Sequence, residues 1–122
     1  MKPVLKPVRW IAGALKDLQG FPEEVRRAVG YALYQAQRGR KHLSAKPLRG
    51  FGGAGVLEVV DDFDGDTYRA VYTVRFVEAV YVLHMFQKKS KRRIATPQKE
   101  IELIRARLKL AEQDYLRRRE AE

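Results

Sequence analysis

The positions of apolar and polar residues in the first third of the chain predict a short extended segment and then two helices. Residues 3–9 alternate between the two kinds, and their two prolines limit them to an edge strand or an extended arm. From Trp10 the apolar residues recur at helical spacing until a C-terminal cap at Gly20. A second helix with one apolar side is expected from Pro22 to Gly39. The short connection between the helices makes an αα-hairpin the expected arrangement.

A loop is expected over residues 40–55, and the pattern after it changes to that of β-strands. Short turn signals separate the strands: Asp64-Gly65 is a strong hairpin dipeptide, and Glu78-Ala79 makes a tight reversal. Strands joined in this way pair with their neighbours along the chain, so the sheet is expected to be antiparallel. The three expected strands span residues 56–60, 67–77 and 80–86.

One more helix is expected near the end of the chain. Thr96 is its expected N-cap and Pro97 its first residue, because these residue types favour those positions. Residues 116–122 are expected to fray from its other end. The apolar residues that recur along it at spacings of three and four are Ile101, Ile104, Leu108, Ala111 and Tyr115.

These elements describe a single domain of the α+β class over residues 1–122, in the order β-α-α-β-β-β-α. The antiparallel sheet is expected to carry an N-terminal helical hairpin and a C-terminal helix. All apolar runs are shorter than the roughly 20 residues of a membrane span, and the N-terminus lacks the apolar segment of a signal peptide. A cytoplasmic protein without a membrane partner is therefore expected.

Charge gives the first indication of a partner. The chain has 25 Lys and Arg residues against 15 Asp and Glu residues, a formal net charge of +10. Such a surplus favours polyanionic partners through Coulomb attraction and counterion release, although it is also typical of a merely solubilising surface. The lack of cysteine excludes disulfides, thiolate zinc sites and a cysteine nucleophile. His42 and His84 are the only histidines, and neither a metal site nor a cofactor is expected.

Two short motifs match ligand-binding patterns by letter only. Residues 50–55 follow the G-x-G-x-x-G pattern, but they do not stand between a strand and a helix, so a dinucleotide site is not expected. Asp62, Asp64 and Asp66 resemble the start of a calcium loop, but its glycine comes one position early and Thr73 stands where a glutamate belongs. A flexible turn and a solvated hairpin tip account for these two segments.

Basic residues gather at three places. Lys46 and Arg49 lie in the loop before the sheet, and Arg69 lies early in the second predicted strand. No acid occurs between Glu78 and Glu100. The basic residues of that window are Lys88, Lys89, Lys91, Arg92, Arg93 and Lys99.

Arg69 has two interpretations. Alternation along its strand directs it away from the side of Tyr68, Ala70 and Tyr72, which is the better core side, onto a face that the last helix covers only in part. There it either contributes to a phosphate-binding concavity or forms a salt bridge across the hairpin, to Glu58 or Asp61.

Four segments and the start of the last helix together carry a resemblance to a known family. The segments are Lys46-Pro47-Leu48, Val56-Leu57-Glu58-Val59, Tyr68-Arg69-Ala70-Val71-Tyr72 and the run from Tyr81 to Ser90, and the helix begins at Pro97. With the element order, they make residues 8–115 similar to the RelE/ParE superfamily of toxins, and most similar to its HigB-like, phage-derived branch. The chain departs from the RelE pattern on its first predicted strand of the meander, where acids such as Glu58 replace bases.

The resemblance implies a toxin of a type II toxin–antitoxin system. Most members of the superfamily are ribosome-dependent mRNA endonucleases (mRNA interferases), so mRNA and the ribosome are implied partners. ParE-type relatives instead poison DNA gyrase, and a phage-derived nucleic-acid-binding module without activity is a third alternative. The implied protein partner is a small helix-turn-helix antitoxin, through which the toxin meets DNA only indirectly.

The family reaction also implies roles for the basic residues. In metal-independent cleavage the 2′-hydroxyl of RNA attacks the adjacent phosphate and the 5′-oxygen leaves, which requires a base, cations around the phosphorane and an acid. By the resemblance, Arg69 stabilises the transition-state charge, and Lys88 and Lys89 hold phosphates or donate a proton. His84 is either a base or a packed core residue. The implied RNA-binding residues are Lys46, Arg49, Lys91, Arg92 and Arg93.

Overall fold

The computed structural model describes residues 4–88 and 95–121. Its elements follow the predicted order with one additional strand. The strands are β1 (Val8–Trp10), β2 (Ala45–Pro47), β3 (Val56–Phe63), β4 (Asp66–Thr73) and β5 (Val80–Lys88), and the helices are α1 (Ala14–Gln19), α2 (Glu23–Gln37) and α3 (Gln98–Glu120).

The five strands form one sheet in the order β1-β5-β4-β3-β2. The pairs from β2 to β5 are antiparallel, as the meander predicts, but β1 lies parallel to β5, with Val8 opposite Val80. The α+β class and the antiparallel meander are confirmed, and the parallel pairing of β1 makes the sheet as a whole mixed. The partner of β1 is far along the chain and no turn signal marks it. Likewise, β2 lies inside the predicted loop because three residues are too few to show an alternating pattern.

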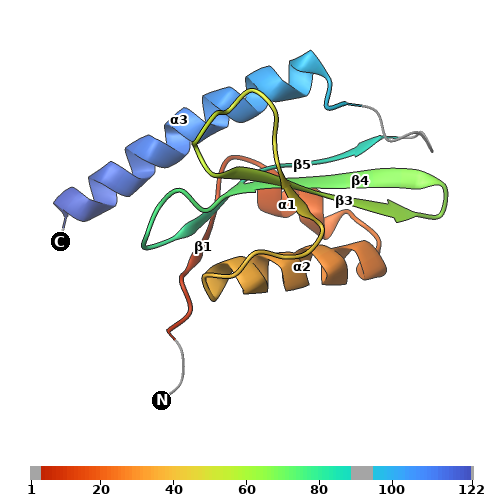
Figure 1. Cartoon of the computed structure of the whole chain (residues 1–122), viewed down its shortest axis with the longest axis horizontal. Helices are drawn as coiled ribbons and strands as arrows, with labels where there is room; N and C mark the ends of the chain where they lie inside the picture. Colours follow the sequence, from red (N-terminus) through yellow and green to blue (C-terminus); the bar gives the residue numbers. More distant parts are fainter. Residues whose placement is uncertain (1–3, 89–94, 122) are drawn as a thin grey trace.

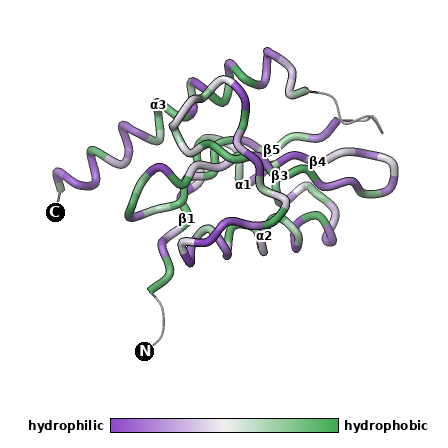
Figure 2. Tube along the Cα trace, in the orientation of Figure 1, coloured by the Kyte–Doolittle hydropathy of each residue, from purple (hydrophilic) through white to green (hydrophobic). Residues whose placement is uncertain are grey.

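Helices cover both faces of the sheet (Figure 1). α1 and α2 pack on one face, where Ala70 and Tyr72 of β4 join their apolar residues in one core cluster. α3 packs on the other face, where Val71 of β4 joins a second cluster. Figure 2 shows that the end of α3 nearest the C-terminus is mainly hydrophilic. Arg69 lies on the face that α3 covers, and its side chain is almost fully buried there.

The helix boundaries differ from the prediction at both ends of the chain. Trp10 belongs to β1, so α1 begins only at Ala14. α3 begins at Gln98, one residue later than predicted, so its N-cap is Pro97 and not Thr96. The Thr96 hydroxyl bonds instead to Arg69 and Glu58. α3 continues to Glu120, through most of the segment that was expected to fray. None of the helices in the described part of the chain combines the length and apolarity needed to cross a membrane.

A β-bulge between β4 and β5 changes the direction in which the side chains of β5 face. Val71 pairs with His84, and the next residue of β4, Tyr72, pairs with Val82, so one residue of β5 is left over. Val82 therefore packs in the cluster with α1 and α2, whereas His84 contacts α3. Strict alternation along β5 would place Val82 and His84 on the same side of the sheet, but it does not survive an inserted residue.

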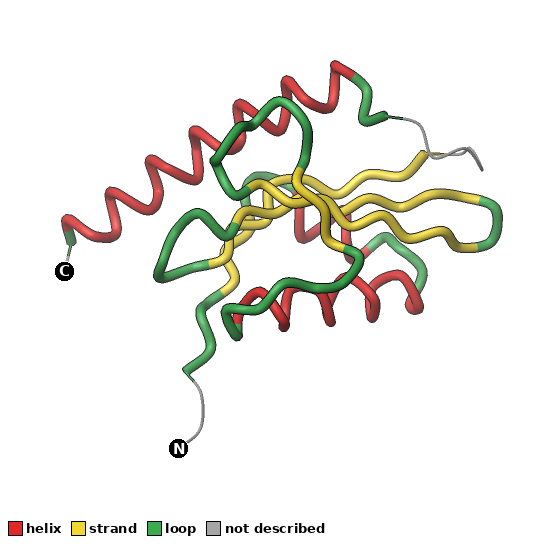
Figure 3. Tube along the Cα trace, viewed as in Figure 1, coloured by secondary structure: helices red, strands yellow, loops and turns green. Residues whose placement is uncertain are grey.

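α3 is fixed to the rest of the molecule near both of its ends. The connection between β2 and β3 reaches it (Figure 3), where Arg105 donates to the Gly50 carbonyl at 3.1 Å and lies 4.8 Å from the centre of the Phe51 ring. Towards the other end, Asp114 accepts a hydrogen bond from the Tyr81 hydroxyl at 2.6 Å. Burial alone would raise the pKa of Asp114, but hydrogen bonds from Tyr81 and two arginines lower it to about 2.

Candidate functional site

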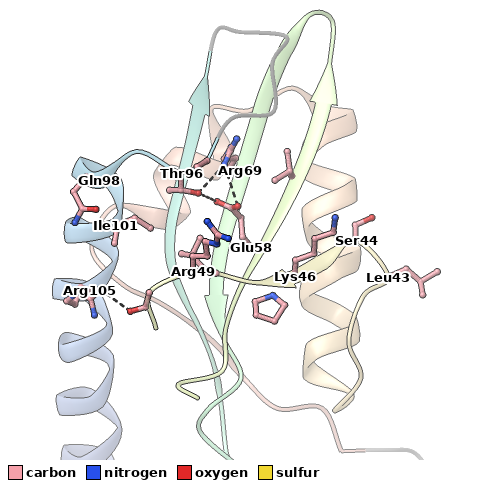
Figure 4. Close-up of a pocket in the computed structure, with 15 residues that line it drawn as sticks. Leu43, Ser44, Lys46, Arg49, Glu58, Arg69, Thr96, Gln98, Ile101 and Arg105 are labelled. Carbon is pink, nitrogen blue, oxygen red and sulfur yellow. Dashed lines mark hydrogen bonds and ion pairs between the residues drawn. The ribbon is translucent and has the colours of Figure 1, made fainter. Parts of the chain in front are cut away.

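A cavity of about 740 Å³ lies between the start of α3, the connection from β2 to β3 and the sheet (Figure 4). Its size is within the range of sites that hold small molecules or parts of larger ligands. Among the described residues of the chain, one acid, Glu58, lines it. The basic residues of its lining are Lys46, Arg49, Arg69 and Arg105. This surplus of positive charge in a concave site favours an anionic ligand.

Glu58, Arg69 and Thr96 come together on one side of the cavity (Figure 4). Arg69 pairs with Val60 across β3 and β4, so Glu58, two residues away from Val60, is its diagonal neighbour on the same face. The Arg69 Nη1 atom lies 3.5 Å from Glu58 Oε1 and donates to Thr96 Oγ1 at 3.0 Å. The Thr96 hydroxyl in turn donates to Glu58 Oε2 at 2.8 Å. The contacts therefore form a closed ring that joins β3, β4 and the segment before α3.

Burial gives this ring its energetic importance. The side chain of Arg69 is 3% exposed and that of Glu58 is 12% exposed. Charges so far from water persist only with a partner of opposite sign and with further hydrogen bonds. Of the two sequence interpretations of Arg69, the salt bridge to Glu58 is present, and the guanidinium also lines the cationic cavity. An arginine held in this way is pre-organised for an anion that enters the cavity.

His84 lies between β5 and α3, outside the cavity lining. Its Nδ1 accepts from Arg107 Nη1 at 3.1 Å, because an arginine can only donate, so its Nε2 carries the proton and contacts the carboxylate of Glu100. The ring also stacks on Phe86, with centres 4.9 Å apart. Burial lowers the pKa of His84, with Glu100 acting in the opposite direction and Arg107 in the same one. These contacts fit the packed residue that the sequence offered as one alternative.

The other basic residues of the sequence prediction fall into three groups. Lys46, on β2 opposite Glu58, and Arg49 both line the cavity and are exposed. Lys88 is half-buried at the end of β5, opposite Thr67, and does not belong to the lining. The predicted residues outside the described part of the chain are Lys89, Lys91, Arg92 and Arg93.

Three lining residues with polar contacts were not identified as site residues from the sequence. Glu58 was considered only as a salt-bridge partner, and Thr96 only as a helix cap. A charged residue between Leu57 and Val59 in a strand was the available signal for Glu58. For Arg105, on an ordinary helical stretch, the sequence gives no signal. Among the residues that the structure describes, no three acids or histidines are grouped as metal ligands would be.

Solved structures share this fold. The isolated E. coli RelE toxin aligns over 83% of this chain and 97% of its own, with 20% sequence identity and a TM-score of 0.53. A double arginine-to-alanine mutant of E. coli RelE in the free state aligns over 66% of this chain and 81% of its own, with 20% identity and a TM-score of 0.51. The RelBE2 toxin–antitoxin complex from Mycobacterium tuberculosis has 26% identity, coverages of 73% and 98%, and a TM-score of 0.47. The two E. coli structures show that this chain has the RelE fold.

No curated protein sequence matches this chain. One family model does: that of the phage derived protein Gp49-like (DUF891) family matches residues 16–109, from within α1 to the middle of α3. This span is most of the chain and contains every residue that lines the cavity. The protein therefore belongs to the phage-derived Gp49-like family.

Proposed function

We propose that this protein is a HigB-like toxin of a type II toxin–antitoxin system, and that it cleaves mRNA on the ribosome without a metal ion. The observation that carries the proposal is the Glu58 carboxylate beside the Arg69 guanidinium in a cationic cavity. The RelE fold and the membership of a phage-derived family support the toxin assignment. The net charge of +10 suits a protein that works on RNA.

The cavity supplies a base and a cation for attack by a neighbouring 2′-hydroxyl. The Glu58 carboxylate takes the proton of this hydroxyl, and the 2′-oxygen forms a bond to phosphorus. Arg69 stabilises the negative charge that collects on the non-bridging oxygens. The bond from phosphorus to the 5′-oxygen then breaks, which leaves a 2′,3′-cyclic phosphate on one product. The departing oxygen takes a proton, for which Lys88 and Lys89 are the proposed donors.

Other residues of the cavity bind the substrate or hold the site in shape. Lys46 and Arg49 are exposed in the lining and suit the phosphates next to the reacting one. Lys91, Arg92 and Arg93 are proposed to extend this contact along the RNA. His84 has a packing role in this scheme, because Glu100 and Arg107 occupy both of its ring nitrogens.

Glu58→Gln tests the assignment of the base. Glutamine has nearly the same shape and keeps an acceptor for Thr96, but it does not take up a proton at neutral pH. We expect cleavage of ribosome-bound mRNA, followed by primer extension, to fall by about 10²–10⁴-fold. Glu112→Gln is the matched control, because Glu112 is a partly exposed acid that pairs with Arg75 and does not line the cavity. Cleavage by Glu58→Gln at the rate of the parent would contradict the proposal.

The proposed partner is a helix-turn-helix antitoxin that neutralises the toxin and brings it to DNA only indirectly. Long basic side chains at the cavity attract an acidic partner quickly, so the complex should form most readily at low salt. Co-expression with the neighbouring gene, with each product tagged in turn, is expected to yield a complex without cleavage activity. Failure to co-purify at low salt would contradict this part of the proposal.

A further inference from the structure

The exposed side of α2 carries aromatic and basic residues in a regular row. Arg27, Tyr31, Tyr34 and Arg38 follow one another at spacings of four, three and four residues, which places them on one side of a helix. The buried residues of α2, such as Val25 and Val29, lie on the other side, against the sheet. Tyr31 is 53% exposed and Tyr34 is 43% exposed. We call these four residues the α2 stripe.

Neighbouring side chains hold both rings of the α2 stripe in place. The Arg38 guanidinium lies over the Tyr34 ring, 5.5 Å from its centre. The ring of His42 meets the ring of Tyr31 at 79°, with centres 5.5 Å apart. Rings that are ordered before a ligand arrives lose little conformational freedom on binding, which favours their use as contact surfaces.

The α2 stripe is continuous with the cavity. The chain that leaves α2 runs past Tyr31 at His42, and the next two residues, Leu43 and Ser44, line the cavity together with Lys46. Figure 1 shows this connection passing from the end of α2 along the helix to the edge of the sheet at β2. An RNA strand that leaves the cavity at Lys46 therefore reaches the α2 stripe without crossing another helix or β-strand.

The whole region is positively charged. Residues 25–57 contain no Asp or Glu. The basic residues of this segment are Arg26, Arg27, Arg38, Arg40, Lys41, Lys46 and Arg49. Arginine and lysine attract phosphates, and aromatic rings and guanidinium planes are surfaces on which unpaired bases stack. At the start of α2, Arg27 pairs with Glu23 at 2.8 Å, and from residue 25 to residue 57 the charge is positive only. The combination of stacking surfaces with this positive charge fits a single-stranded nucleic acid.

We propose that the α2 stripe is a second binding site for single-stranded RNA, occupied by the part of the strand that extends from the cavity. Bases of this part stack on Tyr31 and Tyr34, and its phosphates contact Arg27 and Arg38. The inference rests on the proposed function, because it takes the cavity as the place of the reacting phosphate. It assigns to α2 the contacts that hold the strand outside the reacting dinucleotide.

Binding of an RNA strand that cannot be cleaved tests the α2 stripe independently of the cleavage reaction. The probes are fluorescein-labelled RNA oligonucleotides with 2′-O-methyl groups at every position, of roughly three and roughly ten nucleotides, since single-strand sites on a domain span several nucleotides. Fluorescence anisotropy with the parent is expected to give tighter binding of the longer strand. The double variant Tyr31→Ala/Tyr34→Ala is expected to weaken binding of the longer strand at least about fivefold for each ring, and to leave the shorter strand unaffected.

The matched control is Tyr31→Phe/Tyr34→Phe, which keeps both ring faces and is expected to bind as the parent does. Both rings are exposed, so all variants are expected to unfold at the temperature of the parent. A 5-iodouridine placed in turn along the longer strand is expected to crosslink to Tyr31 or Tyr34 at positions away from the cavity. Parent-like affinity of the alanine pair for the longer strand would overturn the proposal, as would equal losses in the alanine and phenylalanine pairs. Loss of binding in the alanine pair alone would support it even if the parent did not cleave RNA.

Discussion

Removing the hydroxyl of Thr96 tests whether its contacts with Glu58 and Arg69 hold the cavity in shape. Thr96→Val has nearly the same volume but deletes the donor to Glu58 and the acceptor for Arg69. A hydrogen bond to a charged group contributes about 1.5–3 kcal/mol, and both charged partners here are largely buried. Because the two contacts share one hydroxyl and are not additive, we expect the free energy of unfolding to fall by about 2–3 kcal/mol.

Urea unfolding followed by the fluorescence of Trp10, the single tryptophan, measures this change. Trp10 lies on β1, at the edge of the sheet opposite β2, so its signal reports on the whole fold and not on the altered contacts. Thr96→Ser is the matched control, because it keeps the hydroxyl and is expected to retain most of the stability. In the cleavage assay, Thr96→Val is expected to lower kcat more than it raises KM, since it displaces the proposed base and cation but keeps the exposed basic residues.

Two results would refute this reasoning. In the first, Thr96→Val unfolds within about 0.5 kcal/mol of the parent, which is the range of an ordinary surface substitution. In the second, Thr96→Ser loses as much stability as Thr96→Val, which would trace the effect to the methyl group. Either result would mean that the ring of contacts contributes little to the fold.

The sequence alone indicates that Arg69 points outward and that its loss leaves the fold intact. In the structure its partner Glu58 is largely buried, so Arg69→Ala is expected to lower the free energy of unfolding by about 3–5 kcal/mol. A variant as stable as the parent in urea would contradict this. Burial lowers the pKa of His84 from 6.5, so below that pH the unfolded chain binds a proton that the folded chain does not. Stability is therefore expected to fall from about pH 7.5 to about pH 5.5, and the slope should be smaller in His84→Gln; equal slopes would exclude His84 as the cause. Replacing Lys46 and Arg49 with alanine is expected to flatten the log–log salt dependence of RNA binding by about 0.7 for each phosphate that the variant no longer binds, and an unchanged slope would show that neither residue binds phosphate.

The parts of the fold that the sequence predicts correctly are those coded by neighbouring residues. The meander of β3, β4 and β5 follows from the turn at Asp64-Gly65 and from apolar alternation. α2 and α3 follow from apolar residues at helical spacing. By contrast, β1 and β2 are three residues each, and their pairing depends on where distant strands lie. No local pattern encodes such a pairing, so the sequence predicts only an edge strand or arm for the first and a loop for the second.

The residues of the candidate site also fall into those that the sequence identifies and those that depend on contacts between distant segments. The sequence identifies Arg69, Lys46 and Arg49 as site residues because they are basic, and a residue's charge can be read without knowing the fold. That Glu58 faces Arg69 depends on the register of β3 against β4, and that Thr96 reaches both depends on how α3 lies on the sheet. The side of the sheet on which His84 lies depends on the β-bulge, which the alternation of apolar and polar residues does not reveal.

Glu58 has both a structural role and a proposed catalytic role. On the sequence it is a departure from the basic pattern of RelE-type toxins, and by charge alone it weakens a site for RNA. In the structure the same carboxylate compensates the buried charge of Arg69, so it fixes the cation that the chemistry requires. A substitution that removes the side chain therefore disturbs stability and catalysis together, and its loss of activity says little about mechanism. Glu58→Gln keeps the shape, but it also removes the charge that compensates Arg69, so its loss of stability must be measured beside its loss of activity. A loss of cleavage in a variant that is still folded at the assay temperature supports the role of base, whereas a loss that only follows unfolding supports a structural role.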